Sequence, residues 1–119
     1  MKRSNFFVAV SSEDPERLRA FYRETVGLEP FPEMGPGAFH AVEGTFAIAE
    51  HSEVHGPTKE PKRTLFNFFV DDLEAEQREL EARGVPFIRK AGREPWGGII
   101  STFVDPDGNY MQLVEYKPE

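Results

Sequence analysis

Apolar and polar positions follow an order of segments along the chain that occurs twice. Residues 6–10 form a short run of aromatic, alanine and valine side chains, which is typical of a β-strand. Asp14, followed by proline, is a favourable helix start, and apolar residues recur at helical spacing until Gly27, where a glycine favours the end of a helix. The pattern then predicts two more strands, over residues 38–42 and 45–51.

The same order returns in the second half of the chain. Residues 65–70 again form an apolar run, Asp71 and Asp72 offer the next helix cap, and Gly84 is expected to end the helix that follows. The sequence Asp-Pro-Asp-Gly-Asn at residues 105–109 predicts a tight turn. This turn separates two final strands, expected from Ile99 to Val104 and from Tyr110 to Tyr116.

The repeat predicts an α+β fold made of two βαβββ modules in tandem. Module 1 covers about residues 3–51, module 2 covers about residues 64–116, and a polar linker without a regular period joins them over residues 52–63. Together they form a single domain, residues 1–119. Because one helix covers only one face of a sheet, we expect a curved mixed sheet around a cleft, formed within one chain or shared with a second copy.

Composition narrows the classes of partner. The chain has 119 residues, of which 14 are Lys or Arg and 21 are Asp or Glu, so its net charge is −7. That sign is unfavourable for binding phosphates, so we expect neither a nucleic acid nor a membrane as partner. The chain has no cysteine, which excludes disulfides and thiol nucleophiles. The first apolar run is too short for a signal peptide or a membrane span, and we expect a cytoplasmic location.

Three short motifs in this arrangement carry a family resemblance. Phe21 and Tyr22 precede Val-Gly-Leu at residues 26–28, Val-Asp-Asp occupies residues 70–72, and the turn at residues 105–109 comes before the last strand. This combination resembles the vicinal oxygen chelate superfamily, which contains glyoxalase I, bleomycin resistance proteins and extradiol dioxygenases. The resemblance extends over essentially the whole chain and implies the glyoxalase/bleomycin resistance fold.

The resemblance also implies where a metal would bind. Members that use a metal take one ligand from the first strand and one from the last strand of each module. The corresponding positions in this chain are Asn5, Ile48 or Glu50, Leu65 and Gln112. Because leucine cannot coordinate a metal and amides are weak ligands, we expect no metal site and no cofactor. The alternative is a weakly held divalent metal on Glu50, Gln112 and a water, with Glu50 as a catalytic base.

The period of two in strands predicts which side chains line the cleft. We expect a bowl of aromatic and aliphatic groups with a few amides, made of Phe7, Phe46, Ile48, Asn67, Phe69, Trp96 and Gln112. Such a lining favours a small apolar or aromatic ligand. Asn67 and Gln112 are either amides of the pocket or ordinary solvated amides. Glu50 is either a buried base with a raised pKa or a carboxylate in water at a strand end. For Trp96 three roles stay open: it stacks on a ligand, it covers the core, or it forms a dimer contact.

Three hypotheses for the function follow. The first is a homodimeric small-molecule-binding protein that is similar to bleomycin resistance proteins, since sequestration of a molecule needs only a complementary pocket. The second is a metal-dependent glyoxalase-like lyase or isomerase of the same superfamily. The third is a non-enzymatic subunit or regulator whose own phenylalanines fill the pocket.

Overall fold

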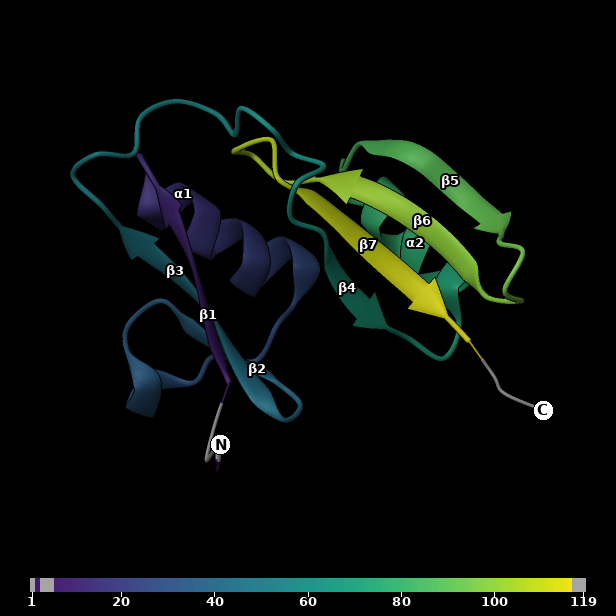
Figure 1. The fold of residues 1–119 in the computed structure, drawn as a ribbon, viewed down its shortest axis with the longest axis horizontal. Helices are drawn as coiled ribbons and strands as arrows, with labels where there is room; N and C mark the ends of the chain where they lie inside the picture. The colour runs from purple at the N-terminus through teal and green to yellow at the C-terminus, as the bar shows by residue number, and fades with distance from the viewer. Residues whose placement is uncertain (1, 3–5, 117–119) are drawn as a thin grey trace. The chain divides into compact units, whose positions relative to one another are not determined.

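The computed structural model describes Lys2 and residues 6–116 of the chain, which divides into two compact units on either side of the Gly56–Pro57 bond (Figure 1). Unit 1 extends to Gly56, and unit 2 begins at Pro57. This boundary falls within residues 52–63, the segment that the sequence predicts as a linker. The predicted metal position Asn5 lies outside the described residues.

Unit 1 consists of one helix and a three-stranded mixed sheet. Its elements are β1 (Phe7–Ser12), α1 (Pro15–Ala20), the π-helical turn η1 (Phe21–Val26), the 3₁₀ turn η2 (Pro32–Met34), β2 (Ala38–Ala41) and β3 (Gly44–Glu50). The strand order is β1-β3-β2, with β1 parallel and β2 antiparallel to the central strand β3. First and last strands of the unit are therefore neighbours.

The helix of unit 1 begins and ends where its sequence predicts. The Asp14 carboxylate accepts a hydrogen bond from the backbone N–H of Arg17 at 3.2 Å, which satisfies one of the free donors of the first turn. Gly27, at φ 85°, ends η1, and its N–H donates to the carbonyl of Tyr22 at 3.0 Å. Tyr22 is fully buried, and its ring meets the ring of Phe46 on β3 at 5.0 Å. One face of the sheet is thus covered by the helix.

The segment between η1 and β2 contributes one isolated bridge to the sheet. Pro30 pairs with Phe39 of β2 in an isolated antiparallel bridge, and the N–H of His40 donates to the carbonyl of Glu29 at 2.9 Å. Prolines 30, 32 and 36 lack the backbone N–H that a longer ladder needs. The βαβββ order survives in unit 1 with its second strand shortened to this contact.

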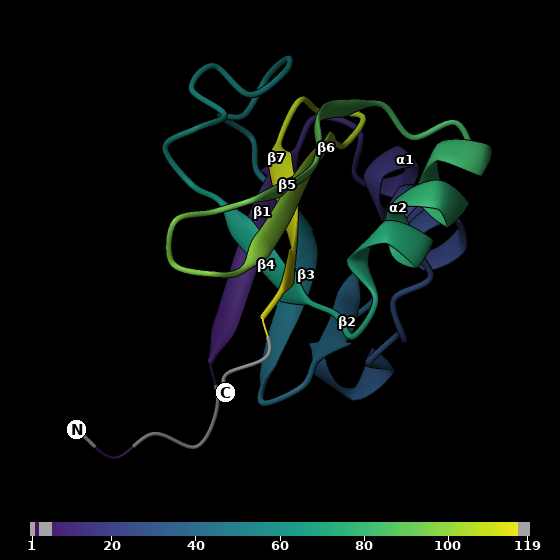
Figure 2. The same cartoon turned by 90° about the vertical axis from the view of Figure 1, so that its right-hand side faces the viewer.

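Unit 2 shows the complete βαβββ order. Its elements are β4 (Phe66–Phe69), α2 (Leu73–Ala82), β5 (Phe87–Arg93), β6 (Ile99–Val104) and β7 (Tyr110–Glu115). The strand order is β4-β7-β6-β5, with β4 parallel to β7 and the other pairs antiparallel. Residues 94–98 connect β5 to β6 in a loop that projects from the sheet (Figure 2).

The helix boundaries and the tight turn predicted for unit 2 are also observed. Asp72 caps α2 by accepting from the N–H of Ala75 at 3.1 Å, and Gly84 follows the helix at φ 86°. In the β6–β7 turn the buried Asp105 carboxylate accepts from the backbone N–H groups of Asp107 and Asn109, each at 2.9 Å. This turn therefore satisfies its own polar groups, as a tight hairpin requires.

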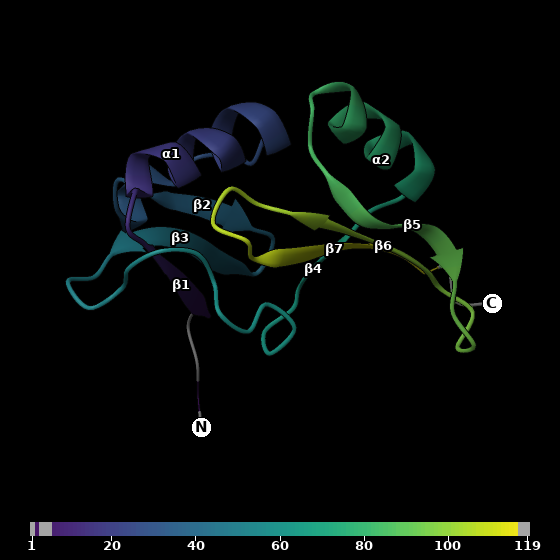
Figure 3. The same ribbon diagram turned by 90° about the horizontal axis from the view of Figure 1, so that it is seen from above.

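Each sheet carries the helix of its own unit on one face only (Figure 3). In unit 2 the buried residues of α2 are Leu73, Gln77 and Leu80, and the buried strand residues include Phe103 and Met111. The opposite face of each sheet carries no helix of its own unit. Among residues 6–116, no helix has the length and apolar character that a membrane crossing needs.

Candidate functional site

The face of the unit 1 sheet that points away from α1 is called here the open face of unit 1. Residues directly opposite each other on paired strands project to the same side. Phe7 lies opposite Thr45 and Ala9 lies opposite Ala47, while Phe46 on the other side packs against the helix. By this register the open face of unit 1 consists of Phe7, Ala9, Ser11, Ala38, His40, Thr45, Ala47 and Ala49.

A hollow of about 250 Å³ lies against the open face of unit 1. Four alanines, residues 9, 38, 47 and 49, contribute to its lining, and their single methyl groups leave space that larger side chains would fill. Met34 and Pro36, from the segment around η2, form another part of the wall. Phe7 also lines the hollow and remains 46% exposed. Small residues on all three strands therefore create an apolar depression.

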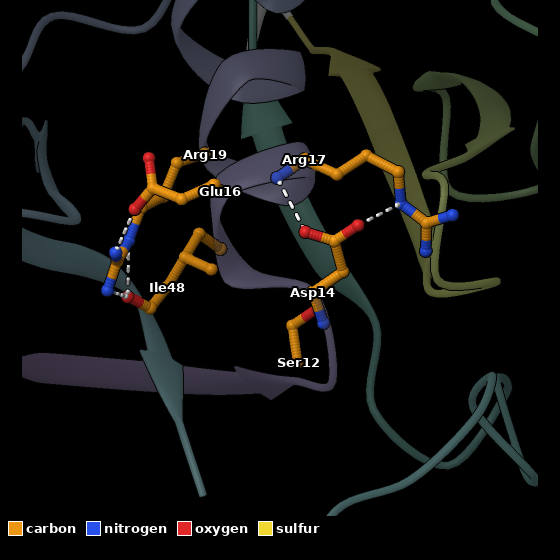
Figure 4. A network of polar contacts seen from close by, with 6 residues as sticks. All are labelled: Ser12, Asp14, Glu16, Arg17, Arg19 and Ile48. Atoms are coloured by element: carbon orange, nitrogen blue, oxygen red, sulfur yellow. Dashed lines mark hydrogen bonds and ion pairs between the residues drawn. The ribbon is translucent and has the colours of Figure 1, made fainter.

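Arg19 of α1 also lines this hollow and is held in place by three hydrogen bonds (Figure 4). Its Nε and Nη2 donate to the backbone carbonyl of Ile48 at 3.3 and 3.0 Å, and its Nη1 donates to the carboxylate of Glu16. The Arg19 side chain is only 16% exposed, whereas that of Glu16 is 76% exposed. The guanidinium is thus a partly buried, oriented donor beside apolar walls.

Gly37 is the residue that makes room for this guanidinium. A Cβ atom at position 37 would lie 2.3 Å from the Arg19 Nε and 2.4 Å from the Ile48 carbonyl oxygen. Both distances are far below van der Waals contact. Because the Ile48 N–H donates to the Gly37 carbonyl at 2.8 Å, the backbone is also fixed at this point. A glycine here is required by the position of Arg19.

The structure separates the side chains that the sequence predicts for this half of the cleft. Phe7 lies on the open face, but Phe46 and Ile48 lie opposite Val8 and Val10 on the covered face, where both are buried. The period of two in β-strands puts even and odd positions of β3 on opposite sides. Phe46 and Ile48 therefore belong to the core beneath α1, and we leave their side chains out of the proposed site.

Glu50 is exposed at the end of β3, opposite Ser12 of β1, and lies at the rim of the hollow. Of the two alternatives for this residue, the structure shows the carboxylate in water at a strand end. The three residues of β3 that face the hollow side, Thr45, Ala47 and Ala49, include neither a histidine nor a carboxylate.

In unit 2 the register brings three predicted residues to one face. Asn67 of β4 lies opposite Gln112 of β7, and Phe69 lies opposite Val114 on the same side. Phe69 is 72% exposed. The Asn67 amide donates to the carbonyl of Leu65 at 3.3 Å, and the Gln112 amide approaches the hydroxyl of Thr102 at 3.4 Å. The register thus places these three side chains on the same side of the sheet, and their role in a ligand site stays a prediction.

Trp96 lies in the loop between β5 and β6 and is half exposed. Its ring meets the ring of Tyr116 edge to face, with 5.4 Å between the centroids. The aromatic contact orients the indole within unit 2. Its assignment to a ligand site stays a prediction.

The residues at the predicted metal positions do not fit a catalytic metal. Ile48 is buried on the covered face, Leu65 offers only hydrocarbon, and Gln112 is a neutral amide beside Thr102. Within the part of the chain that the structure describes, no three histidine, aspartate or glutamate side chains gather in a way that could hold an ion. Catalytic sites for divalent metals typically use three protein ligands.

Sequence reasoning missed Arg19, Met34 and Gly37. Arg19 has the spacing of a solvated helix residue, and Met34 and Gly37 lie in a segment that the prolines mark only as a turn. The alanines left a weak signal, because Ala9, Ala47 and Ala49 alternate within predicted strands. The bond from Arg19 to Ile48, which is 29 positions away, left none.

Two units of βαβββ order, each with one helix on a mixed sheet, define the glyoxalase/bleomycin resistance fold. Residues 6–113 match the family model of the Glyoxalase/Bleomycin resistance protein/Dioxygenase superfamily. The chain belongs to this superfamily, and the resemblance seen in its motifs is confirmed. No curated protein shows significant sequence similarity to the chain.

Solved structures agree with this assignment. A protein from Bacillus anthracis, provisionally described as a glyoxalase family protein, is 26% identical with a TM-score of 0.76, over 98% of both chains. A superfamily member from Sphaerobacter thermophilus is 23% identical with a TM-score of 0.76, over 97% of this chain and 98% of the other. A lactoylglutathione lyase from Agrobacterium tumefaciens is 21% identical with a TM-score of 0.70, over 97% and 95%. The last two support the fold alone.

Proposed function

We propose that this protein binds a small, largely apolar organic molecule without covalent chemistry, at the hollow on the open face of unit 1. The observation that carries this proposal is the alanine-lined depression beside the exposed ring of Phe7. Ligand sites are typically apolar concavities with a few polar groups that fix orientation, and Arg19 is such a group here. The volume of about 250 Å³ favours a ligand below drug size.

The chemistry of the residues favours binding over catalysis. The superfamily takes its name from two groups of enzymes, the glyoxalases and the dioxygenases, and from the bleomycin resistance protein. Glu50, the predicted catalytic base, lies exposed in water, and the metal positions carry hydrocarbon or neutral amide groups. A general base works best where its environment tunes its proton affinity, and sequestration needs no such group.

We further propose that the face of the unit 2 sheet with Asn67, Phe69 and Gln112 contributes binding surface of its own. Phe69 offers an exposed aromatic ring, and Asn67 and Gln112 offer amide groups beside it on the same side of the sheet. An aromatic surface flanked by amides supports both apolar contact and hydrogen bonds. We include Trp96 in this proposed binding surface, because it is an aromatic residue of the same unit.

The proposal is tested by screening a fragment library against the ¹⁵N-labelled protein and measuring the affinity of each hit for variants. Ala9→Phe places a ring in the hollow at an exposed position of β1. We expect the affinity of hits that shift unit 1 resonances to fall by about tenfold or more, because the ring occupies their volume.

Ala41→Phe is the matched control. Ala41 is equally exposed and lies in the same sheet, but its position in the register is on the other face. Wild-type affinity of Ala9→Phe for all hits would contradict the proposed site.

For unit 2, Phe69→Ala and Gln112→Ala are expected to lower the affinity of hits that shift resonances of β4 and β7. Unchanged affinity in both variants would place the ligand elsewhere.

A further inference from the structure

We propose that Arg19 selects ligands with a neutral oxygen acceptor, such as an amide or ketone, over ligands with a carboxylate. This inference rests on the proposed binding site at the hollow of unit 1. It states which chemical class of small apolar molecule that site prefers.

The first step of the argument is the number of available donors. A guanidinium has five N–H groups. The three bonds of Arg19 to the Ile48 carbonyl and to Glu16 use one N–H on each of Nε, Nη1 and Nη2. Among the residues that the structure describes, one N–H on Nη1 and one on Nη2 therefore remain for another acceptor. Because Arg19 lines the hollow, a molecule bound there lies beside this guanidinium.

The second step is the position of the guanidinium. Two of its N–H groups share the single carbonyl oxygen of Ile48, and the absent side chain of Gly37 makes room for them. The group is therefore oriented before any ligand arrives, and little side-chain freedom is lost when a ligand binds. A preorganised donor of this kind selects ligands by the placement of their acceptor atom.

The third step is the charge balance around the hollow. Glu16 pairs with Arg19, and Glu50 is a second carboxylate, which lines the hollow itself. One positive and two negative side chains leave a negative balance at this site, within a chain of net charge −7. A carboxylate ligand would meet like charge there, whereas a neutral carbonyl oxygen accepts the same hydrogen bonds without repulsion. The geometry thus supplies donors, and the charges disfavour anions.

The test uses three probes with the same ring and different polar groups: benzamide, benzoate and benzylamine. Each is titrated into the ¹⁵N-labelled protein, and affinities are taken from backbone shifts at positions 9, 38, 47 and 49. We expect benzamide to bind at least about fivefold more tightly than benzoate and benzylamine. Equal affinities for benzamide and benzoate would overturn the inference.

A charge variant separates selection from a purely structural role of Arg19. Glu16→Gln keeps the shape of an exposed side chain and removes the carboxylate that balances Arg19. We expect the ratio of benzamide to benzoate affinity to fall by about fivefold. Glu24→Gln is the matched control, because Glu24 is 69% exposed and pairs with Arg23, which unlike Arg19 does not line the hollow. An unchanged ratio in Glu16→Gln would overturn the inference.

A variant of the donor itself completes the test. Arg19→Lys keeps the charge and loses the planar pair of N–H groups, so the preference for benzamide is expected to disappear. Amide spectra of each variant establish that unit 1 is folded before affinities are compared. If all three probes shift the hollow residues with the same affinity in every variant, the inference fails and the proposed binding site stands. If no probe shifts these residues, the proposed function itself fails.

Discussion

Val42 is the one described residue other than glycine with a positive φ, at 51°. It lies in the turn between β2 and β3 and is fully exposed. A β-branched side chain in the left-handed region is strained, and no burial of apolar surface offsets that strain here. The conformation is imposed by the turn, which joins β2 to β3 so that Ala41 lies opposite Gly44.

We predict that Val42→Asn stabilises the protein by about 1 kcal/mol, because asparagine tolerates the left-handed region better than a β-branched residue. Thermal unfolding followed by circular dichroism measures the effect as a rise in Tm. Glu43→Asn changes the neighbouring residue of the same turn, where φ is not positive, and serves as the control. A Tm of Val42→Asn at or below that of the wild type would contradict the prediction.

Single residues also mark where sequence reasoning stops. Asp14, Gly27, Asp72 and Gly84 were predicted as helix boundaries because caps and left-handed glycines act locally. The face of Phe46 could not be predicted in the same way. Residues 46–49 of β3 are all apolar, so an alternation of apolar and polar residues does not distinguish the two sides there. Only the pairing with β1 and the ring of Tyr22 decide the side.

At the scale of elements, α2 is tied to β5 at an irregular point of the strand. The β5–β6 register shifts between Arg89 and Gly92, and the N–H of Ala91 in this interval donates to the Gln77 side chain at 2.9 Å. The Gln77 amide in turn donates to the Glu81 carboxylate at 2.9 Å. The hydrogen bond from Gln77, together with Lys90, holds the pKa of the Glu81 carboxyl below its ordinary value.

We predict that Gln77→Ala destabilises the protein by about 1–3 kcal/mol, since it removes the partner of the Ala91 N–H at a buried position. Chemical denaturation measures this loss, and Arg78→Ala on the exposed side of α2 is the control. The same substitution should raise the pKa of Glu81, which an NMR titration follows. In the wild type the stabilising contribution of Glu81 is present above its unfolded pKa and is lost as the pH falls through its lowered folded pKa.

Elements also show which part of the fold was accessible from sequence. The order of strands and helices in unit 2 follows from turns and caps, each of which acts over a few residues. In unit 1 the prolines between residues 30 and 36 predict a turn, and the second strand of the βαβββ order is shortened there to one bridge. The hollow was not foreseen, because it depends on how Met34 and Pro36 lie against the alanines of the strands.

At the scale of the whole molecule, superfamily membership is shown by a match over residues 6–113, and the individual activity has to come from the side chains. Those side chains present apolar surface with amides and one oriented arginine. Among Lys2 and residues 6–116, they include no group of carboxylates and histidines that could hold a divalent metal tightly.

We predict that the protein purified after expression with added nickel, manganese, iron and zinc carries far less than one metal per chain. Leu65 has no donor atom, and Gln112 is a weak neutral ligand. Plasma mass spectrometry of the desalted protein measures the ratio. A ratio near one metal per chain would contradict this prediction and favour the lyase hypothesis.

We also predict a homodimer, as the resemblance to bleomycin resistance proteins implies. Size-exclusion chromatography with light scattering should give twice the chain mass of 13.6 kDa. The exposed Ile88 on unit 2 is an apolar group that a second copy would cover. A mass of one chain across the concentration range would contradict this expectation.

The two sheets take their strands from separate parts of the chain, and this separation has a consequence for biosynthesis. Within the described residues, every strand partner of the unit 1 sheet lies before Gly56, and every strand partner of the unit 2 sheet lies after it. All strands of the first sheet are therefore synthesised before any strand of the second sheet. Neither sheet has to hold an unpaired central strand while the other is translated, which shortens the time during which apolar strands are open to misassembly on the nascent chain.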